Sequence, residues 1–98
     1  MKFILNFTPT SRESLRKLKK DSGLKKRYKA VVKTLRLLSE NPKHPSLQTH
    51  PYYSIVGPKG EKVFEAYAEQ RTPAAYRVFF YYGPHKGEIT IFAITPHP

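Results

Sequence analysis

The chain contains no cysteine and no tryptophan among its 98 residues. Without cysteine it can form no disulfide bond, no thiolate metal site and no thiol nucleophile, and this absence is typical of a reducing compartment. The four histidines show neither metal-ligand spacing nor an HExxH pattern, so we expect no metal and no cofactor. The N-terminal apolar run of residues 3–5 is too short for a signal peptide or a membrane span. Together these absences predict a cytoplasmic protein with no membrane partner.

Acidic residues are also scarce. Seven carboxylates oppose eighteen basic side chains, which gives a formal net charge of +11. A field of this sign attracts polyanions, because it raises their local concentration and speeds their association. We therefore expect nucleic acid as the first class of partner, an acidic protein as the second and anionic lipid as the third.

The basic side chains are concentrated in one stretch. Residues 12–36 hold eleven of the eighteen, opposed only by Glu13 and Asp21, and so carry a net charge of +9. Helix surfaces usually interleave both signs, because pairs spaced by four residues stabilise a helix. This imbalance favours a surface that faces a polyanion over a merely solvated helix face. Lys25, Lys26 and Arg27 are the nucleic-acid-binding candidates of this stretch.

Hydrophobic periodicity and turn residues predict the order of the elements. A first strand covers residues 2–8, and a helix follows to about residue 20, with Thr10 and Glu13 in the spacing of a capping box. A second helix carries an apolar face of Leu24, Tyr28, Val31, Val32, Leu35 and Leu38 and stops before Pro42. Residues 41–60 are expected to form a long connection, followed by strands over residues 61–69, 75–82 and 88–95.

This order predicts an α+β fold in a single domain of residues 1–98. An N-terminal strand leads into an antiparallel helical hairpin, and a three-stranded antiparallel meander follows. Neither the hairpin nor the sheet can bury its apolar face alone, so we expect the helices to pack on one face of a single sheet and to leave the other face open.

Strand alternation places several functional candidates on that open face. Arg77, Phe79 and Tyr81 alternate with apolar neighbours in one strand, as do Glu65 and Tyr67 in the strand before. Aromatic rings beside cations suit single-stranded RNA. A plainer interpretation is that Arg77 only forms an ion pair with Glu65 or Glu69. The histidines also have plainer interpretations, in which His97 is only solvated and His44 and His50 only cap turns.

These residues resemble the RelE/ParE superfamily of toxins from type II toxin–antitoxin modules. The resemblance covers essentially the whole chain and depends on the element order, the basic hairpin, the strand of residues 76–80 and the strand of residues 89–94. It implies a RelE-like fold, a cognate antitoxin as partner, and an activity that depends on the branch. The RelE and YoeB branches cut messenger RNA in the ribosomal A site, whereas the ParE branch poisons DNA gyrase.

The resemblance favours the nuclease branch, a ribosome-dependent and metal-independent endoribonuclease (an mRNA interferase) that inhibits translation. Arg77 matches the catalytic arginine of that branch, and His97 matches the C-terminal histidine of YoeB-like members, although Pro98 replaces their terminal tyrosine. Arg77 is expected to stabilise the phosphorane, and His97, Glu65 and His50 are the candidates for acid and base.

The remaining nucleic-acid-binding candidates are Lys62, Tyr67, Arg71 and Tyr81, with the ribosome and the message as partners. The alternatives are a ParE-like gyrase inhibitor and a relative that binds the ribosome or RNA without cutting.

Overall fold

A computed structural model of the chain describes residues 2–98. Its helices are α1 (Pro9–Lys20) and α2 (Lys25–Glu40), with short 3-10 turns at η1 (Ser22–Leu24) and η2 (Pro45–Leu47). Its strands are β1 (Ile4–Phe7), β2 (His50–Val56), β3 (Lys62–Tyr67), β4 (Tyr76–Tyr82) and β5 (Glu88–Pro96). The predicted helical hairpin is confirmed, and α2 ends one residue before Asn41-Pro42, as the proline rule requires.

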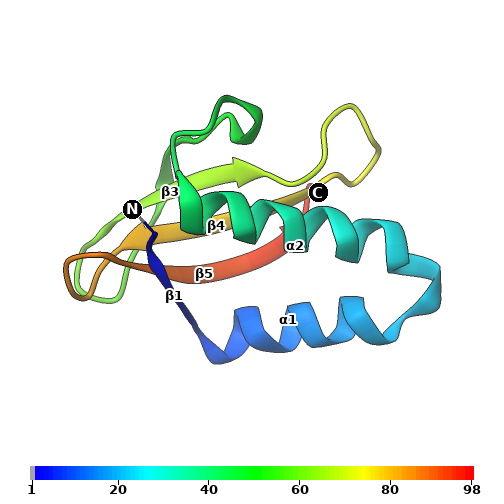
Figure 1. The fold of residues 1–98 in the computed structure, drawn as a ribbon, viewed down its shortest axis with the longest axis horizontal. Coiled ribbons are helices and arrows are strands. Elements are labelled where there is room, and N and C mark those ends of the chain that lie inside the picture. The colour runs from blue at the N-terminus through cyan, green and yellow to red at the C-terminus, as the bar shows by residue number, and fades with distance from the viewer. Residues whose placement is uncertain (1) are drawn as a thin grey trace.

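All five strands form one sheet in the order β1-β5-β4-β3-β2 (Figure 1). β1 pairs with β5 in parallel, and the other neighbours are antiparallel. The prediction that residues 41–60 form only a connection was wrong, because β2 adds a fourth strand to the meander. Pro51 and the two tyrosines that follow it show no strand alternation, so the sequence did not indicate a strand here. β2 lies at the sheet edge, where a proline is tolerated.

The first helix begins in a different way from the prediction. Thr8 is the N-cap, and its hydroxyl accepts a hydrogen bond from the Ser11 amide, whereas Thr10 lies inside the first turn. Glu13 does not close a capping box but pairs with Arg16. Thr8 is the better cap because Pro9 can occupy the first helical position, where its missing amide costs nothing.

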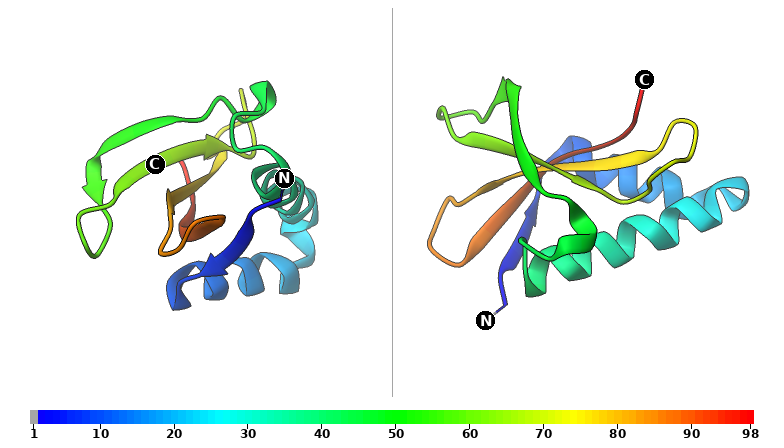
Figure 2. Two further views of the ribbon diagram at one scale, coloured as in Figure 1. Left: turned by 60° about the vertical axis from the view of Figure 1, so that its left-hand side comes forward. Right: turned by 90° about the horizontal axis from the view of Figure 1, so that it is seen from above.

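Both helices cover the same face of the sheet, as the view in Figure 2 shows. The core between them contains Leu18, Val31, Leu35, Leu38, Leu47, Ala66, Val78, Phe80, Ile89, Ile91 and Ile94. The α2 stripe is confirmed except at Val32, which is 40% exposed. The buried face of α2 is therefore narrower than the apolar face that the periodicity predicted.

The opposite face of the sheet is only partly open. Phe79 and Tyr81 point there from β4 and are nevertheless buried. The Tyr52 ring of β2 packs edge-on against Phe79 at 4.9 Å, and Phe92 contacts Tyr81 at 6.2 Å. β2, which the sequence did not predict, thus covers part of the sheet face that was expected to be open.

Candidate functional site

Three side chains from three neighbouring strands meet on the face opposite the helices. Nε2 of His50 lies 2.7 Å from Oε1 of Glu65, and Nη1 of Arg77 lies 2.7 Å from Oε2 of the same carboxylate. The Glu65 side chain is only 4% exposed, so both of its oxygens are occupied and hidden. The ion pair of Arg77 with Glu65, one of the two alternatives for this arginine, is therefore present.

His50 faces acceptors on both sides of its ring. Its Nδ1 lies 2.9 Å from the main-chain oxygen of Gln48, while its Nε2 faces Glu65. A carbonyl and a carboxylate oxygen can only accept hydrogen bonds, so one ring nitrogen of His50 donates to one of them while the other nitrogen lies beside a second acceptor.

The guanidinium of Arg77 is fixed from several sides. Its side chain is 11% exposed, and its Cζ lies 4.9 Å from the centre of the Phe79 ring. Its Nε is buried and has no hydrogen-bond partner among the described residues. An unsatisfied buried donor costs about 1–3 kcal/mol of stability. Arg77 therefore has one unused hydrogen-bond donor although its guanidinium is held in place by Glu65 and Phe79.

Tyr67 lies directly opposite Arg77 in the β3–β4 pairing. Its ring lies 5.6 Å from the His50 ring. Burial raises the pKa of the Tyr67 hydroxyl above its ordinary value of 10.0, and the negative charge of Glu65 raises that pKa further. The hydroxyl is therefore a hydrogen-bond donor at neutral pH.

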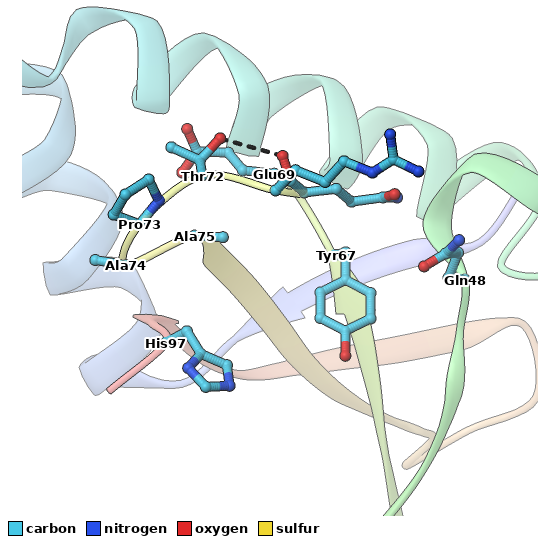
Figure 3. A pocket seen from close by; sticks show the side chains of 10 residues that line it. Gln48, Tyr67, Glu69, Thr72, Pro73, Ala74, Ala75 and His97 are labelled. Atoms are coloured by element: carbon cyan, nitrogen blue, oxygen red, sulfur yellow. Dashed lines mark hydrogen bonds between the residues drawn. The ribbon is translucent and has the colours of Figure 1, made fainter.

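A cavity of about 440 Å³ opens beside Tyr67. Figure 3 shows the Tyr67 ring between Gln48 and His97, with the loop of residues 69–75 above them. This volume lies in the usual range for small-ligand pockets, roughly 300–1,000 Å³. The cavity is the place where the C-terminal histidine approaches the end of the sheet.

His97 and Arg77 lie on the same face but do not share this cavity. The His97 amide donates to the Ala75 oxygen, and Arg77 pairs with Thr95, so the two side chains are two positions apart along the strands. The guanidinium turns toward Glu65, away from the cavity lining that includes His97. Arg77 and His97 therefore lie on one face without sharing a cavity, while Tyr67 lines the cavity beside His97 and pairs with Arg77 across the strands.

Arg27 holds the loop above the cavity. Its Nη1 donates to the Ala74 oxygen at 2.6 Å and its Nη2 to the Pro73 oxygen at 3.0 Å. Nη1 also lies 3.6 Å from Glu69, and the guanidinium lies over the Tyr76 ring at 5.6 Å. Arg27 was predicted to bind nucleic acid, and the structure instead gives its donors to the protein's own main chain.

The other predicted contacts are scattered. Lys25, Lys26 and Arg71 are exposed, and Arg71 lines the cavity. Lys62 lies at the far end of β3 from Tyr67, with its Nζ over the Tyr53 and Phe64 rings. Tyr81 is 8% exposed, so its ring offers no open stacking surface and its assignment as a nucleic-acid contact is corrected.

Gln48 and Gln70 line the cavity but were not among the predicted site residues. Neither belongs to a sequence motif, and an amide side chain carries no charge pattern that would single it out. Their placement depends on the left-handed backbone at Gln48 and on the 69–75 loop, which local sequence does not specify.

Within residues 2–98, no group of three or more histidine, aspartate or glutamate side chains is arranged to hold a metal ion. None of the described helices is both long and apolar enough to cross a membrane.

Three solved structures resemble this chain over almost their entire length. The YoeB/ParE toxin from Agrobacterium tumefaciens has a TM-score of 0.69 at 11% identity, and all of both chains is covered. The YoeB dimer from Staphylococcus aureus has a TM-score of 0.70 at 12% identity, again with all of both chains covered. The archaeal RelE–RelB complex from Pyrococcus horikoshii OT3 has a TM-score of 0.66 at 14% identity, covering 98% of this chain and 96% of the other.

No protein-family model matches the sequence. A search of curated proteins finds no similar sequence either. The likeness is therefore one of architecture, which in this chain is a helical hairpin on one face of a five-stranded sheet. The chain has the same fold as these YoeB/ParE, YoeB and RelE structures.

Proposed function

We propose that this chain is the toxin of a toxin–antitoxin module and that it cuts messenger RNA on the ribosome. The observation that carries the proposal is that Arg77, Tyr67 and His97 lie on one face near the end of the sheet, with Tyr67 and His97 lining a cavity. The fold of the YoeB and RelE toxins and the net charge of +11 support the same function.

The proposed reaction needs no metal. The ribose 2′-oxygen attacks the adjacent phosphorus, and the bond from phosphorus to the 5′-oxygen breaks. A base accepts the proton of the 2′-hydroxyl, an acid protonates the leaving 5′-oxygen, and a cation stabilises the phosphorane. Arg77 suits the last role because its planar fork matches phosphate oxygens.

His97 is the side chain best placed for proton transfer. It is exposed, and its Nδ1 lies 2.9 Å from the Pro98 oxygen, which leaves Nε2 toward solvent. Glu65 is too buried to meet a substrate, and both ring nitrogens of His50 are occupied. We therefore assign Glu65 and His50 to positioning Arg77, and the Tyr67 hydroxyl to hydrogen bonding with the phosphate.

The test is a translation extract supplied with the purified chain and a reporter message, followed by primer extension. The wild type should arrest translation and produce new 5′ ends within codons. Arg77→Ala and His97→Ala should each reduce these ends by about 10²–10⁴-fold, the usual contribution of one such group. Lys86→Ala, in the exposed turn before β5, is the matched control and should cut normally. Arrest without new 5′ ends would overturn the nuclease function.

One observation favours a second candidate, a relative that binds the ribosome or RNA without cutting. Glu65 neutralises Arg77 directly, so the cation meets a carboxylate before it meets a phosphate. In that case arrest occurs without cleavage, and Arg77→Ala weakens binding only. A DNA supercoiling assay with gyrase separates the remaining ParE-like alternative, in which the chain blocks gyrase and leaves translation running.

An antitoxin partner belongs to this proposal. The Pyrococcus horikoshii neighbour was solved as a complex of RelE with RelB, and the basic hairpin here offers a surface for an acidic segment. Such a complex should weaken steeply with salt, since its exposed charges are screened beyond about 10 Å at 0.1 M ionic strength. The cytoplasmic location remains a prediction.

A further inference from the structure

The cavity beside Tyr67 is lined by backbone in an unusual conformation. Within residues 2–98, three residues other than glycine have a positive φ: Gln48 at 47°, Arg71 at 58° and Ala74 at 53°. All three line this one cavity. Non-glycine residues in the left-handed region cost of order 1–3 kcal/mol each and cluster at functional sites. Three such residues around one hollow indicate that its shape is maintained against local preference.

Hydrogen bonds from Arg27 also hold the loop that lines the cavity. The two donations from Arg27 to the Pro73 and Ala74 oxygens fix the part of the loop that contains Ala74. Glu69 accepts from the Tyr76 amide at 3.0 Å and lies near Arg27, so its charge is occupied at the base of the loop. The loop that forms the cavity is thus held in place by specific hydrogen bonds.

The side chains around the cavity suit a flat, polar-edged ring. Tyr67 offers an aromatic face, and Pro73 and Ala74 offer apolar surface. The side-chain amide of Gln48 has no hydrogen bond to another described residue, whereas its main-chain N–H donates to the Pro45 oxygen, and this residue is exposed. Gln70 donates to the Ser46 oxygen at 3.3 Å and keeps its own oxygen as an acceptor. An amide presents a donor and an acceptor side by side, which is the pattern that matches a base edge.

We propose that this cavity binds one unstacked nucleobase of a single-stranded RNA, with the Tyr67 ring stacked on the base and the Gln48 amide hydrogen-bonded to its edge. The proposal rests on the proposed function, because it takes RNA as the substrate. Adenine is the expected base, since glutamine pairs with adenine through two hydrogen bonds. Arg71 then neutralises an adjacent phosphate without reading sequence. The charged hairpin supplies affinity, and the cavity supplies base preference.

The test measures the affinity of the purified chain for 2′-O-methyl RNA pentamers, which cannot undergo attack by a 2′-hydroxyl. The pentamers differ only in the central base, and fluorescence anisotropy gives each Kd. The wild type should bind the adenine pentamer more tightly than the weakest one by roughly 5- to 150-fold, the discrimination that a bidentate pair provides. Equal affinity for all four bases, or no binding, would overturn the proposal.

Gln48→Gly is the decisive variant, because glycine adopts the positive φ freely and only the amide is lost. It should bind all pentamers with nearly equal affinity, whereas Lys86→Ala should keep the wild-type preference. Tyr67→Ala should weaken binding to every pentamer by roughly 5- to 150-fold, as expected for a lost stacking surface. A Gln48→Gly chain that keeps the adenine preference contradicts the assigned role of the amide.

This experiment separates the inference from the proposed function. If the wild type produces no new 5′ ends on ribosomes but binds the pentamers with a Gln48-dependent preference, cleavage fails and the base site stands. If messages are cut but the pentamers are bound alike, the base site fails and the nuclease stands.

Discussion

Nη1 of Arg77 lies 2.7 Å from Oε2 of Glu65, and both side chains are almost entirely buried. The residue expected to stabilise a phosphorane is therefore already paired with a carboxylate. The Glu65 carboxylate also faces His50, so both of its oxygens are occupied by neighbouring side chains. Any phosphate that approaches Arg77 has to be attracted by the positive charge of the chain as a whole.

The first prediction concerns Glu65→Gln. The substitution keeps the shape of the side chain and removes its charge, so Arg77 loses its counter-ion and His50 loses a carboxylate partner. Breaking one partner out of a buried ion pair costs about 3–5 kcal/mol, and we expect a loss near 3 kcal/mol because the amide oxygen still accepts one hydrogen bond. RNA binding should tighten, since a repelling charge is removed. Urea denaturation and filter binding measure the two effects.

Glu13→Gln is the matched control for this prediction. Glu13 also pairs with an arginine, but the pair is at the surface, where solvent screens it. Its loss should change neither stability nor RNA affinity appreciably. Equal effects of the two substitutions on stability and RNA affinity would contradict the role assigned to the buried Glu65 carboxylate.

The second prediction concerns the Tyr67 hydroxyl. The group is protonated at neutral pH, because even the ordinary tyrosine pKa of 10.0 lies well above neutrality, so it can donate to a phosphate oxygen. Tyr67→Phe removes that donor and preserves the ring. Since a hydrogen bond to a charged group contributes about 1.5–3 kcal/mol, cleavage on ribosomes should fall by roughly 10- to 150-fold. The binding preference among RNA pentamers should stay as in the wild type, because stacking needs only the ring.

The third prediction concerns acid stability at the start of β5. Glu88 Oε1 accepts from Asn6 at 3.2 Å and lies 3.2 Å from His85 Nδ1. These contacts, that from Asn6 first, lower the pKa of Glu88 below its ordinary value of 4.5. A lowered folded-state pKa stabilises the native state above the unfolded pKa, and this stabilisation is lost as pH falls through the folded pKa.

The wild type should accordingly lose more stability than Glu88→Gln when the pH falls from about 5 to about 3. The urea midpoint measured across this range gives the comparison. Asn6→Ala, which removes the main donor, should flatten the curve in the same way. Identical slopes for all three chains would show that Glu88 plays no part in acid unfolding.

The fourth prediction distinguishes the two threonines at the start of α1. Thr8 caps the helix and also donates to the Phe92 oxygen at 3.0 Å, whereas Thr10 is exposed within the first turn. Thr8→Ala should reduce the free energy of unfolding by about 1–2 kcal/mol, the usual cost of a lost N-cap. Thr10→Ala should be close to neutral in the same urea titration. The reverse order would restore the capping box that the sequence predicted.

Much of the fold follows from local pattern. The apolar steps of three and four in α2 and the alternation in β4 depend only on neighbouring residues, so the helices, three of the meander strands and the face of Arg77 could be predicted. The alternation also put Glu65 and Tyr67 beside Arg77 correctly. These are consequences of helix and strand periodicity, which act within one element.

The features that the sequence did not predict depend on contacts between distant parts of the chain. β2 contains Pro51 and two tyrosines without clean alternation, and it forms because β3 offers it a free edge to pair with. The same pairing brings His50 to Glu65 and covers Phe79 with Tyr52. No window of sequence around His50 contains that information.

The sequence by itself determined the strong positive charge, the helical hairpin and the strand alternation that puts Arg77 and Glu65 on one face. Only the tertiary structure decided that Glu65 is a buried counter-ion, that Arg27 ties down a loop, and that Gln48 borders a cavity with His97. The physical reason is range: periodicity and charge are properties of short stretches, whereas burial and pairing depend on strands that meet only after the chain has folded.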